Sequence, residues 1–178
     1  MMMTCLSAGI AWSGAAPGQP ADPQPWNVSG KLLGKPDNDG SGNKKAEDVS
    51  GIACETSSGF PRICLVADDE SQGAQIVILK EDELIAGDFV RLIDDSFAGK
   101  PLELDAEGVA FADGSFYVIG SHGRPRREDG DSDAKIEARV KASSRIFRIR
   151  FAPGSIDLAT GELEGQPDTT PSLGLPDL

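Results

Sequence analysis

Short apolar runs separated by turn residues dominate the middle of the chain. Two of them, at 48–53 and 105–110, share the pattern Asp-x-[Ser/Glu]-Gly-[Ile/Val]-Ala and begin 57 residues apart. Each motif is followed in the same order by two further apolar segments, at 63–67 and 75–79 in the first copy and at 116–120 and 145–151 in the second. This matched order predicts an internal repeat of short β-strands.

A fourth segment completes each copy, at 89–93 in the first and, with a weaker pattern, at 155–158 in the second. Four short antiparallel strands per repeat are typical of a propeller blade. The predicted fold class is therefore all-β, with antiparallel propeller-like blades at about 48–92 and 105–158 that belong to an incomplete propeller. Two unrelated hairpins of a β-sandwich are the alternative interpretation.

Local signals in the second copy agree with this prediction. Asp113 and Gly114 lie between its first two strands, and this pair favours a two-residue turn that joins antiparallel strands. Between residues 145 and 151 apolar residues largely alternate with arginines, so one face of that strand is expected to be apolar and the other basic.

Two polar insertions interrupt the repeats. Residues 35–47 are rich in Lys, Asp, Asn and Gly, and they are expected to form a loop. Residues 122–143 are also polar, and there a short helix is expected over 134–141 with Asp133 as its cap.

The N-terminal segment differs in character from the repeats. Residues 1–25 lack charge until Asp22, have a short apolar stretch and end in a Pro-rich linker, which predicts a degraded signal peptide and a periplasmic or extracellular protein. The propeller-like domain is expected at 26–165 and a polar tail at 166–178. No apolar run reaches the ~18 residues that a membrane-spanning helix needs, so no membrane span is expected.

Charge is distributed unevenly along the chain. The formal net charge is −12, which argues against nucleic acid as a partner, because phosphate backbones favour basic surfaces. Residues 61–114 carry thirteen acidic and four basic residues, whereas residues 121–151 hold nine of the seventeen Lys and Arg against five acids. An acidic region followed by a basic one suits a site that binds a cation together with an anion, and ordinary solvated surface is the alternative.

The cysteines predict a disulfide. Cys54 ends the first strand of the first copy and Cys64 lies early in the second strand, so a hairpin brings them together on adjacent strands. Cys5, the third cysteine, falls in the expected leader, and its removal leaves an even pair. Such a pair is typical of an oxidising compartment and excludes a cysteine-rich zinc site.

Four segments together resemble a bacterial domain-of-unknown-function family of propellers, related in motif to the SdiA-regulated and phytase-like propellers. They are the first repeat motif, Cys-Leu-Val-Ala-Asp-Asp-Glu-Ser-Gln-Gly-Ala-Gln from Cys64, Glu-Leu-Asp-Ala-Glu-Gly-Val-Ala from Glu103, and Gly-Ser-His-Gly-Arg-Pro-Arg from Gly120. They cover roughly 26–165. The resemblance implies a propeller and no established activity. It also implies a further Glu-Gly-[Leu/Val]-Ala repeat, so the ring-closing blades are expected to be missing.

Acidic residues of the repeat form the first candidate site. In a propeller the first strand of each blade lines the central channel, so Asp105 and Glu107, two residues apart, are expected to point the same way. Asp69 and Glu70, after the second strand of the first copy, are expected to extend the same rim, as is Asp68. Carboxylate oxygens suit Ca²⁺ or Mg²⁺, and Ca²⁺ is the cofactor we expect. A structural role in turns and backbone bonding is the alternative.

The basic loop after the second strand of the second copy is the other candidate site. Its glycines leave backbone N–H groups open, and His122, Arg124 and Arg126 are expected to bind phosphate or carboxylate. A structural loop with solvated arginines is the alternative. His122 is the only histidine, and no Gly-x-Ser-x-Gly motif accompanies it, so a serine–histidine hydrolase is not favoured.

Together the two sites predict a module that binds a phosphate- or carboxylate-bearing small molecule with the help of a divalent cation. Hydrolysis of the bound molecule is the catalytic form of this prediction. The alternative function is a non-catalytic propeller scaffold that binds a protein or carbohydrate. Whether the protein is an enzyme is left open by the sequence.

Overall fold

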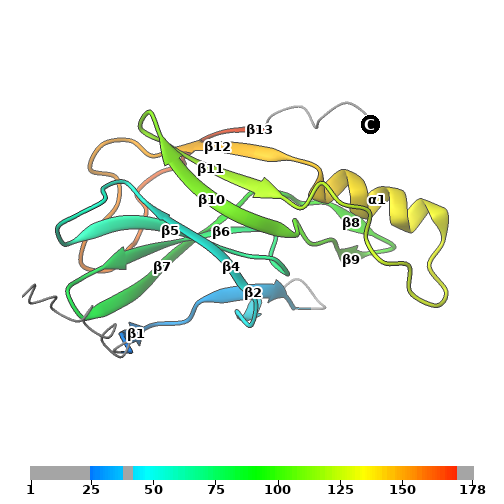
Figure 1. The fold of residues 1–178 in the computed structure, drawn as a ribbon, viewed down its shortest axis with the longest axis horizontal. Helices are drawn as coiled ribbons and strands as arrows, with labels where there is room; N and C mark the ends of the chain where they lie inside the picture. Colours follow the sequence, from blue (N-terminus) through cyan, green and yellow to red (C-terminus); the bar gives the residue numbers. More distant parts are fainter. Residues whose placement is uncertain (1–24, 38–41, 172–178) are drawn as a thin grey trace, which may run out of the picture.

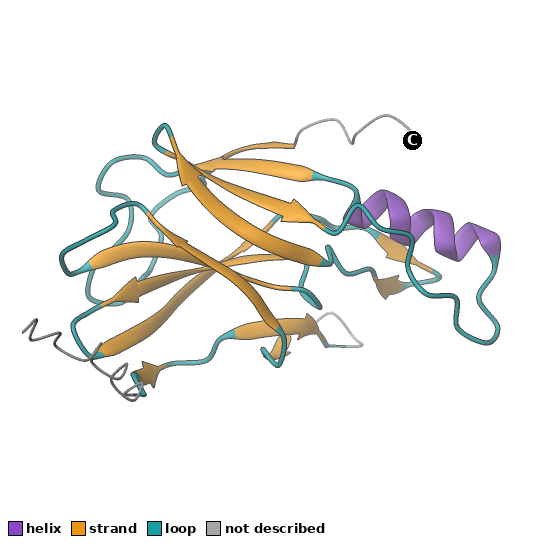
Figure 2. Cartoon of the chain, viewed as in Figure 1, coloured by secondary structure: helices purple, strands orange, loops and turns teal. Residues whose placement is uncertain are grey.

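A computed structural model describes residues 25–37 and 42–171 of the chain. Strands dominate this part, and a single helix packs at one end (Figures 1 and 2). The elements in order are β1 (Asn27–Ser29), β2 (Leu33–Pro36), β3 (Asn43–Lys45), β4 (Val49–Cys54), β5 (Arg62–Asp68), β6 (Gly73–Leu79), β7 (Glu83–Arg91), β8 (Ser96–Phe97), β9 (Lys100–Pro101), β10 (Ala106–Ala112), β11 (Ser115–Gly120), α1 (Asp133–Ser143), β12 (Ile146–Arg150) and β13 (Asp168–Pro171).

The first repeat forms a sheet in the order β1-β7-β6-β5-β4, which we call the first sheet. Its four repeat strands are antiparallel, and β1 adds to β7 in parallel. The strand predicted at 89–93 starts earlier, at Glu83. A tight turn in which Lys80 N–H donates to the Glu83 carbonyl (2.8 Å) returns the chain directly after β6, so pairing begins there.

The second repeat forms a sheet in the order β10-β11-β12-β13, which we call the second sheet, and all of its strands are antiparallel. Asp113 and Gly114 both have positive φ, 49° and 68°, as a two-residue primed turn requires. In β12 buried Phe147 and Ile149 alternate with exposed arginines, as predicted. The strand predicted at 155–158 does not form, because Ile156 makes only an isolated bridge to Leu163; β13 takes the fourth place.

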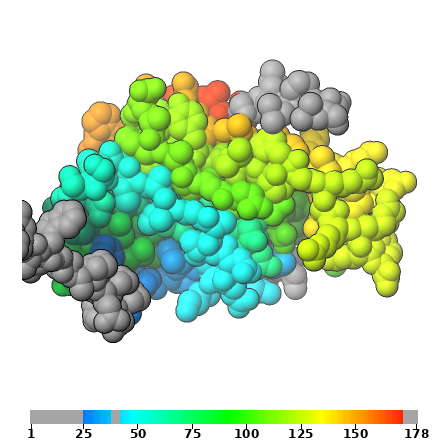
Figure 3. All heavy atoms as spheres, in the orientation of Figure 1, coloured from blue at the N-terminus to red at the C-terminus, as the bar shows by residue number. Residues whose placement is uncertain are grey.

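The core lies between the two sheets. One continuous cluster of buried apolar side chains joins Leu65 and Ile76 of the first sheet to Phe116 and Ile149 of the second. Figure 1 shows the second sheet above the first, with β4 and β10 side by side, and in the space-filling view of Figure 3 the cyan and green parts of the chain adjoin. The all-β class is therefore confirmed, and each repeat forms one sheet that opens with the repeat motif. The propeller arrangement stays a prediction.

The described part of the first insertion contains strands that were not expected, and the second insertion contains the expected helix. The predicted loop at 35–47 contributes the ends of a short hairpin, because β2 pairs with β3. The predicted helix is present and extends two residues further than expected, to Ser143. Its N-cap is Ser132 rather than Asp133: the Ser132 side chain accepts from Lys135 N–H at 3.2 Å, whereas Asp133 lies inside the first turn.

A disulfide joins Cys54 of β4 to Cys64 of β5, as predicted. The two residues are direct cross-strand partners, with Cα atoms 3.9 Å apart. The expected leader at 1–25 falls almost wholly outside the described residues. Within the described ranges, no helix has both the length and the apolar character needed to cross a membrane.

Candidate functional site

Four aspartates meet where β4 and β10 begin and β5 ends. Asp48 directly precedes β4, Asp68 is the last residue of β5, Asp69 follows it, and Asp105 directly precedes β10. Asp69 N–H donates to the Asp48 carbonyl at 3.2 Å. The negative charges of Asp48, Asp68 and Asp105 all act on the Asp69 carboxyl group. The fold therefore gathers the first residues of both repeat motifs around Asp69.

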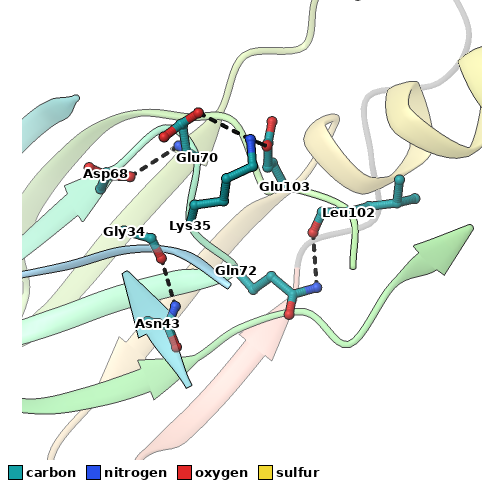
Figure 4. Close-up of polar contacts among 8 residues, drawn as sticks. All are labelled: Gly34, Lys35, Asn43, Asp68, Glu70, Gln72, Leu102 and Glu103. Atoms are coloured by element: carbon teal, nitrogen blue, oxygen red, sulfur yellow. Dashed lines mark hydrogen bonds and ion pairs between the residues drawn. The ribbon is translucent and has the colours of Figure 1, made fainter. Parts of the chain in front are cut away.

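Asp68 has a structural role in this cluster. Its side chain is buried, and its two carboxylate oxygens accept from Asp48 N–H (3.2 Å) and Glu70 N–H (3.1 Å), the second of which is drawn in Figure 4. Burial raises the pKa of Asp68, and these backbone hydrogen bonds oppose that rise. Because both oxygens accept hydrogen bonds from the nearby backbone, Asp68 holds the start of β4 against the end of β5.

Asp69 differs from its neighbour. Its Oδ1 atom is buried and has no hydrogen-bond partner among the described residues. Burial raises the pKa of Asp69, the nearby charges of Asp48 and Asp68 raise it further, and the backbone N–H of Glu70 partly opposes this rise. A buried carboxylate oxygen that faces other acids and lacks a donor is electrostatically unfavourable, unless a proton or a cation compensates it.

Asp105 connects the acidic cluster to the basic loop. Its backbone φ is +54°, and its Oδ2 atom accepts from Ser121 Oγ at 2.6 Å. Ser121 Oγ in turn accepts from Gly123 N–H at 3.4 Å. The carboxylate of Asp105 therefore holds the beginning of the loop that carries His122, Arg124 and Arg126.

Glu107 stands apart from these contacts. The strand begins at Ala106 and its register shifts between Ala106 and Gly108, so the regular alternation expected for Asp105 and Glu107 does not hold. The Glu107 side chain is exposed, and in the described part of the chain it has neither a hydrogen bond nor an ion pair. Ser50, the matching residue of the first repeat, instead donates to the Ala106 carbonyl.

Glu70 is engaged by a lysine that the sequence did not indicate. Lys35 Nζ lies 3.2 Å from Glu70 and 2.8 Å from Glu103, and Figure 4 shows it between the two carboxylates. The hydrogen bond to Glu103 is the main cause of the raised pKa of Lys35. Lys35 lies in β2, inside the predicted loop at 35–47, so no local pattern pointed to this contact.

Two side-chain amides bond to the backbone of the same region. The side chain of Gln72 is buried and donates to the carbonyl groups of Leu102 (2.9 Å, drawn in Figure 4) and Asp95 (3.0 Å). Next to Lys35, Asn43 of β3 donates to the Gly34 carbonyl at 2.6 Å, which closes the short β2–β3 hairpin. The Gln72 bonds thus connect the segment after Glu70 to the one that carries Glu103, and the Asn43 bond fixes the hairpin that carries Lys35.

The basic loop is only partly free to bind an anion. His122 has a φ of +51°; its Nδ1 atom lies 2.7 Å from the Gly120 carbonyl, and its Nε2 atom is buried without a partner among the described residues. Arg124 and Arg126 are exposed. Arg127 forms an ion pair with Asp133 at the start of α1. The loop therefore presents two exposed guanidinium groups, and its third arginine is neutralised within the chain.

The structure brings some of the predicted site residues together and leaves others apart. Asp69 and Asp105 belong to one cluster, and Glu70 is paired with Lys35. Glu107 has no hydrogen bond or ion pair in the described part of the chain. Across residues 25–37 and 42–171, no group of three or more His, Cys, Asp or Glu side chains has the geometry of a metal centre. Neither family models, nor curated proteins, nor solved structures match the chain.

Proposed function

We propose that the protein is a divalent-cation-dependent module that binds a phosphate- or carboxylate-bearing small molecule where β4, β5 and β10 meet. The observation that carries this proposal is the buried Oδ1 atom of Asp69, which has no hydrogen-bond donor among the described residues and is surrounded by the charges of three other aspartates. A buried polar atom of this kind calls for an ion, a water molecule or a proton.

The chemistry of the surrounding groups favours a cation. Asp48, Asp69 and Asp105 offer hard carboxylate oxygens, the ligands that Ca²⁺ prefers. Asp68 is occupied by two backbone N–H groups, so it contributes charge rather than a free oxygen. In this proposal a cation draws the remaining aspartates toward Asp69 and removes their mutual repulsion.

The anion would then bind between the cation and the basic loop. Asp105 contacts Ser121 at 2.6 Å, which ties the start of the loop to the acidic cluster. Exposed Arg124 and Arg126 follow within five residues of Ser121. A phosphate or carboxylate group bridging a bound cation and an arginine satisfies both charges, and guanidinium groups suit such oxyanions.

The cation part is tested by thermal unfolding of the full chain. Ca²⁺ is expected to raise the melting temperature and a chelator to lower it, because a ligand that binds only the folded state stabilises it by mass action. Asp69→Asn should abolish the Ca²⁺ response. Asp94→Asn, which changes an aspartate whose side chain is 88% exposed, should retain it. A melting temperature of the wild-type protein that does not change with Ca²⁺ would contradict the proposal.

Two further arms assign the remaining residues. Inorganic phosphate, added with Ca²⁺, should raise the melting temperature beyond Ca²⁺ alone, and replacement of both Arg124 and Arg126 by Gln should remove that increment. Glu107→Gln tests the sequence-based prediction that Glu107 is a ligand: loss of the Ca²⁺ response would place it in the site, and an unchanged response would exclude it.

A non-catalytic scaffold is the second candidate function, and one observation favours it. The face of the second sheet that points away from the core is open and bears exposed apolar side chains, including Ile119, which is 41% exposed. A scaffold with this face as its binding surface would show no response to Ca²⁺ or phosphate.

A further inference from the structure

The two sheets can be compared position by position, because each begins with the same motif. Ala53 of β4 corresponds to Ala110 of β10, and their cross-strand partners are Leu65 and Tyr117. Gly51 corresponds likewise to Gly108, with Ala67 and Ile119 as partners. These residues share one face of their own sheet, which we call the forward face.

The forward face of the first sheet is covered by the second sheet. Leu65 and Ala67 have no exposed surface and belong to the core between the sheets. Gly51 permits the close approach, because a β-carbon there would lie only 3.0 Å from the Gly108 Cα and Val109 N atoms of β10. Glycine is thus required where one inner strand packs on the next.

The forward face of the second sheet is open. Ala110 is exposed and Tyr117 is half-buried, whereas the equivalent Leu65 is fully covered. A β-carbon on Gly108 would meet nothing closer than Ile119 Cγ2, at 3.8 Å. The described residues therefore give no steric reason for a glycine at position 108, although the first repeat requires one at the equivalent place.

On the opposite face of the first sheet only the strand β4 is open, because Val66 and Val77 of the neighbouring strands are already buried together with Leu32. Ile52 and Val49 of β4 are 48% and 49% exposed. The equivalent residues of β10 are Val109, which packs against the core, and Ala106, which is fully buried. Val49 and Ile52 of β4 are thus exposed, whereas the equivalent residues of β10 are partly or fully buried against the first sheet.

The two open surfaces carry charges of mainly opposite sign. Arg148, the cross-strand partner of Tyr117, is exposed on the forward face of the second sheet and lies 3.9 Å from Asp168, and Arg150 is exposed two residues further along β12. Exposed Glu55 follows β4, and Asp48 of the acidic cluster precedes it. Opposite charges at the edge of an interface guide association and favour the correct pairing.

We propose that the chain self-associates head to tail, with the forward face of the second sheet of one copy docked on β4 of the next copy. This contact repeats between copies only the close approach of β10 to β4 that occurs within one copy. Because the two docking surfaces differ, the contact is heterologous and extends into a ring or an open chain of copies. The contact shares Asp48 with the proposed cation site but requires no bound cation.

Sedimentation velocity of the full chain tests this proposal. The wild-type protein is expected to sediment faster as its concentration rises, and high salt should weaken the association. Gly108→Val should leave a monomer at every concentration, because the new side chain blocks the close approach while the strand gains a residue of high β-propensity. Its far-ultraviolet circular dichroism spectrum should match that of the wild type.

Mixing two variants separates a head-to-tail contact from a symmetric one. Gly108→Val blocks only the forward face, and Ile52→Arg blocks only the edge of β4, so each variant alone should be monomeric. An equimolar mixture should form a dimer that contains one copy of each and grows no further. A wild-type monomer at all concentrations would overturn the proposal, and so would a mixture that stays monomeric.

Discussion

Neighbouring residues of the same type have different roles at the acidic end of the sheets. Asp68 and Asp69 are adjacent, yet Asp68 accepts two backbone hydrogen bonds whereas Oδ1 of Asp69 has no partner among the described residues. The repeat shows the same divergence: Ser50 donates to the Ala106 carbonyl, and the equivalent Glu107 is exposed. Local chemistry at these positions depends on which backbone groups the fold brings within reach.

We expect Asp69→Asn to stabilise the protein at neutral pH in the presence of a chelator. The pKa of Asp69 is raised in the folded state, so the folded state binds this proton more tightly than the unfolded state does. The contribution of this proton to the free energy of unfolding is complete below the ordinary Asp pKa of about 3.9 and is lost as the pH rises through the folded-state pKa. Asn does not ionise and avoids that loss. Melting temperatures measured from acidic to neutral pH should diverge in favour of the variant, and parallel curves would contradict the prediction.

At the scale of elements, the strand β4 is held more firmly than its place at the sheet edge suggests. It pairs with β5 on one side, and its Cys54 is bonded covalently to Cys64 directly opposite. On its other side it lies against β10, which comes close at Gly51. The disulfide thus secures the strand that both begins the first sheet and contacts the second.

Reduction of the disulfide should destabilise the folded chain by about 3 kcal/mol, which is the chain-entropy value for a loop whose ends are 10 residues apart. Denaturant midpoints of the oxidised and reduced wild-type protein measure this difference. The double variant Cys54→Ala, Cys64→Ala serves as a control, because its midpoint should not respond to reductant. Equal midpoints for the two wild-type forms would show that the cross-link does not contribute.

At the scale of the whole molecule, one ion pair joins the segment between the repeats to the second repeat. Arg145, next to the start of β12, binds Asp95 in the segment after β7 through two contacts of 2.8 Å. The carbonyl of Asp95 also accepts from the buried side chain of Gln72. Through Gln72, this bidentate pair connects the first repeat to the second outside the apolar core.

Arg145→Lys should lower the free energy of unfolding by about 1–2 kcal/mol, because lysine keeps the charge but cannot form the paired hydrogen bonds. Arg127→Lys is the matched control: Arg127 also pairs with an aspartate, but the side chains of that pair are 53% and 81% exposed. It should change stability by no more than about 0.5 kcal/mol. Chemical denaturation of both variants measures the two changes in the free energy of unfolding, and equal changes would contradict the prediction.

Elements with a strong local pattern were predictable. The repeat motif, the buried strands β5 and β6, the turn at Asp113-Gly114 and the helix after residue 132 all follow from apolar periodicity and turn chemistry within a few residues. The strands β2, β3 and β13 were not predictable, because they have few apolar residues and form through pairing with neighbouring strands.

The candidate site shows the same division. The sequence by itself determined that acidic residues begin the repeats, that a basic loop follows the second copy and that Cys54 and Cys64 pair, since each depends on neighbours along one hairpin or motif. Only the tertiary structure decided that Lys35 neutralises Glu70 and that Asp69 and Asp105 share a cluster. Contacts between segments far apart in the chain arise from the packing of the sheets, which no local pattern encodes.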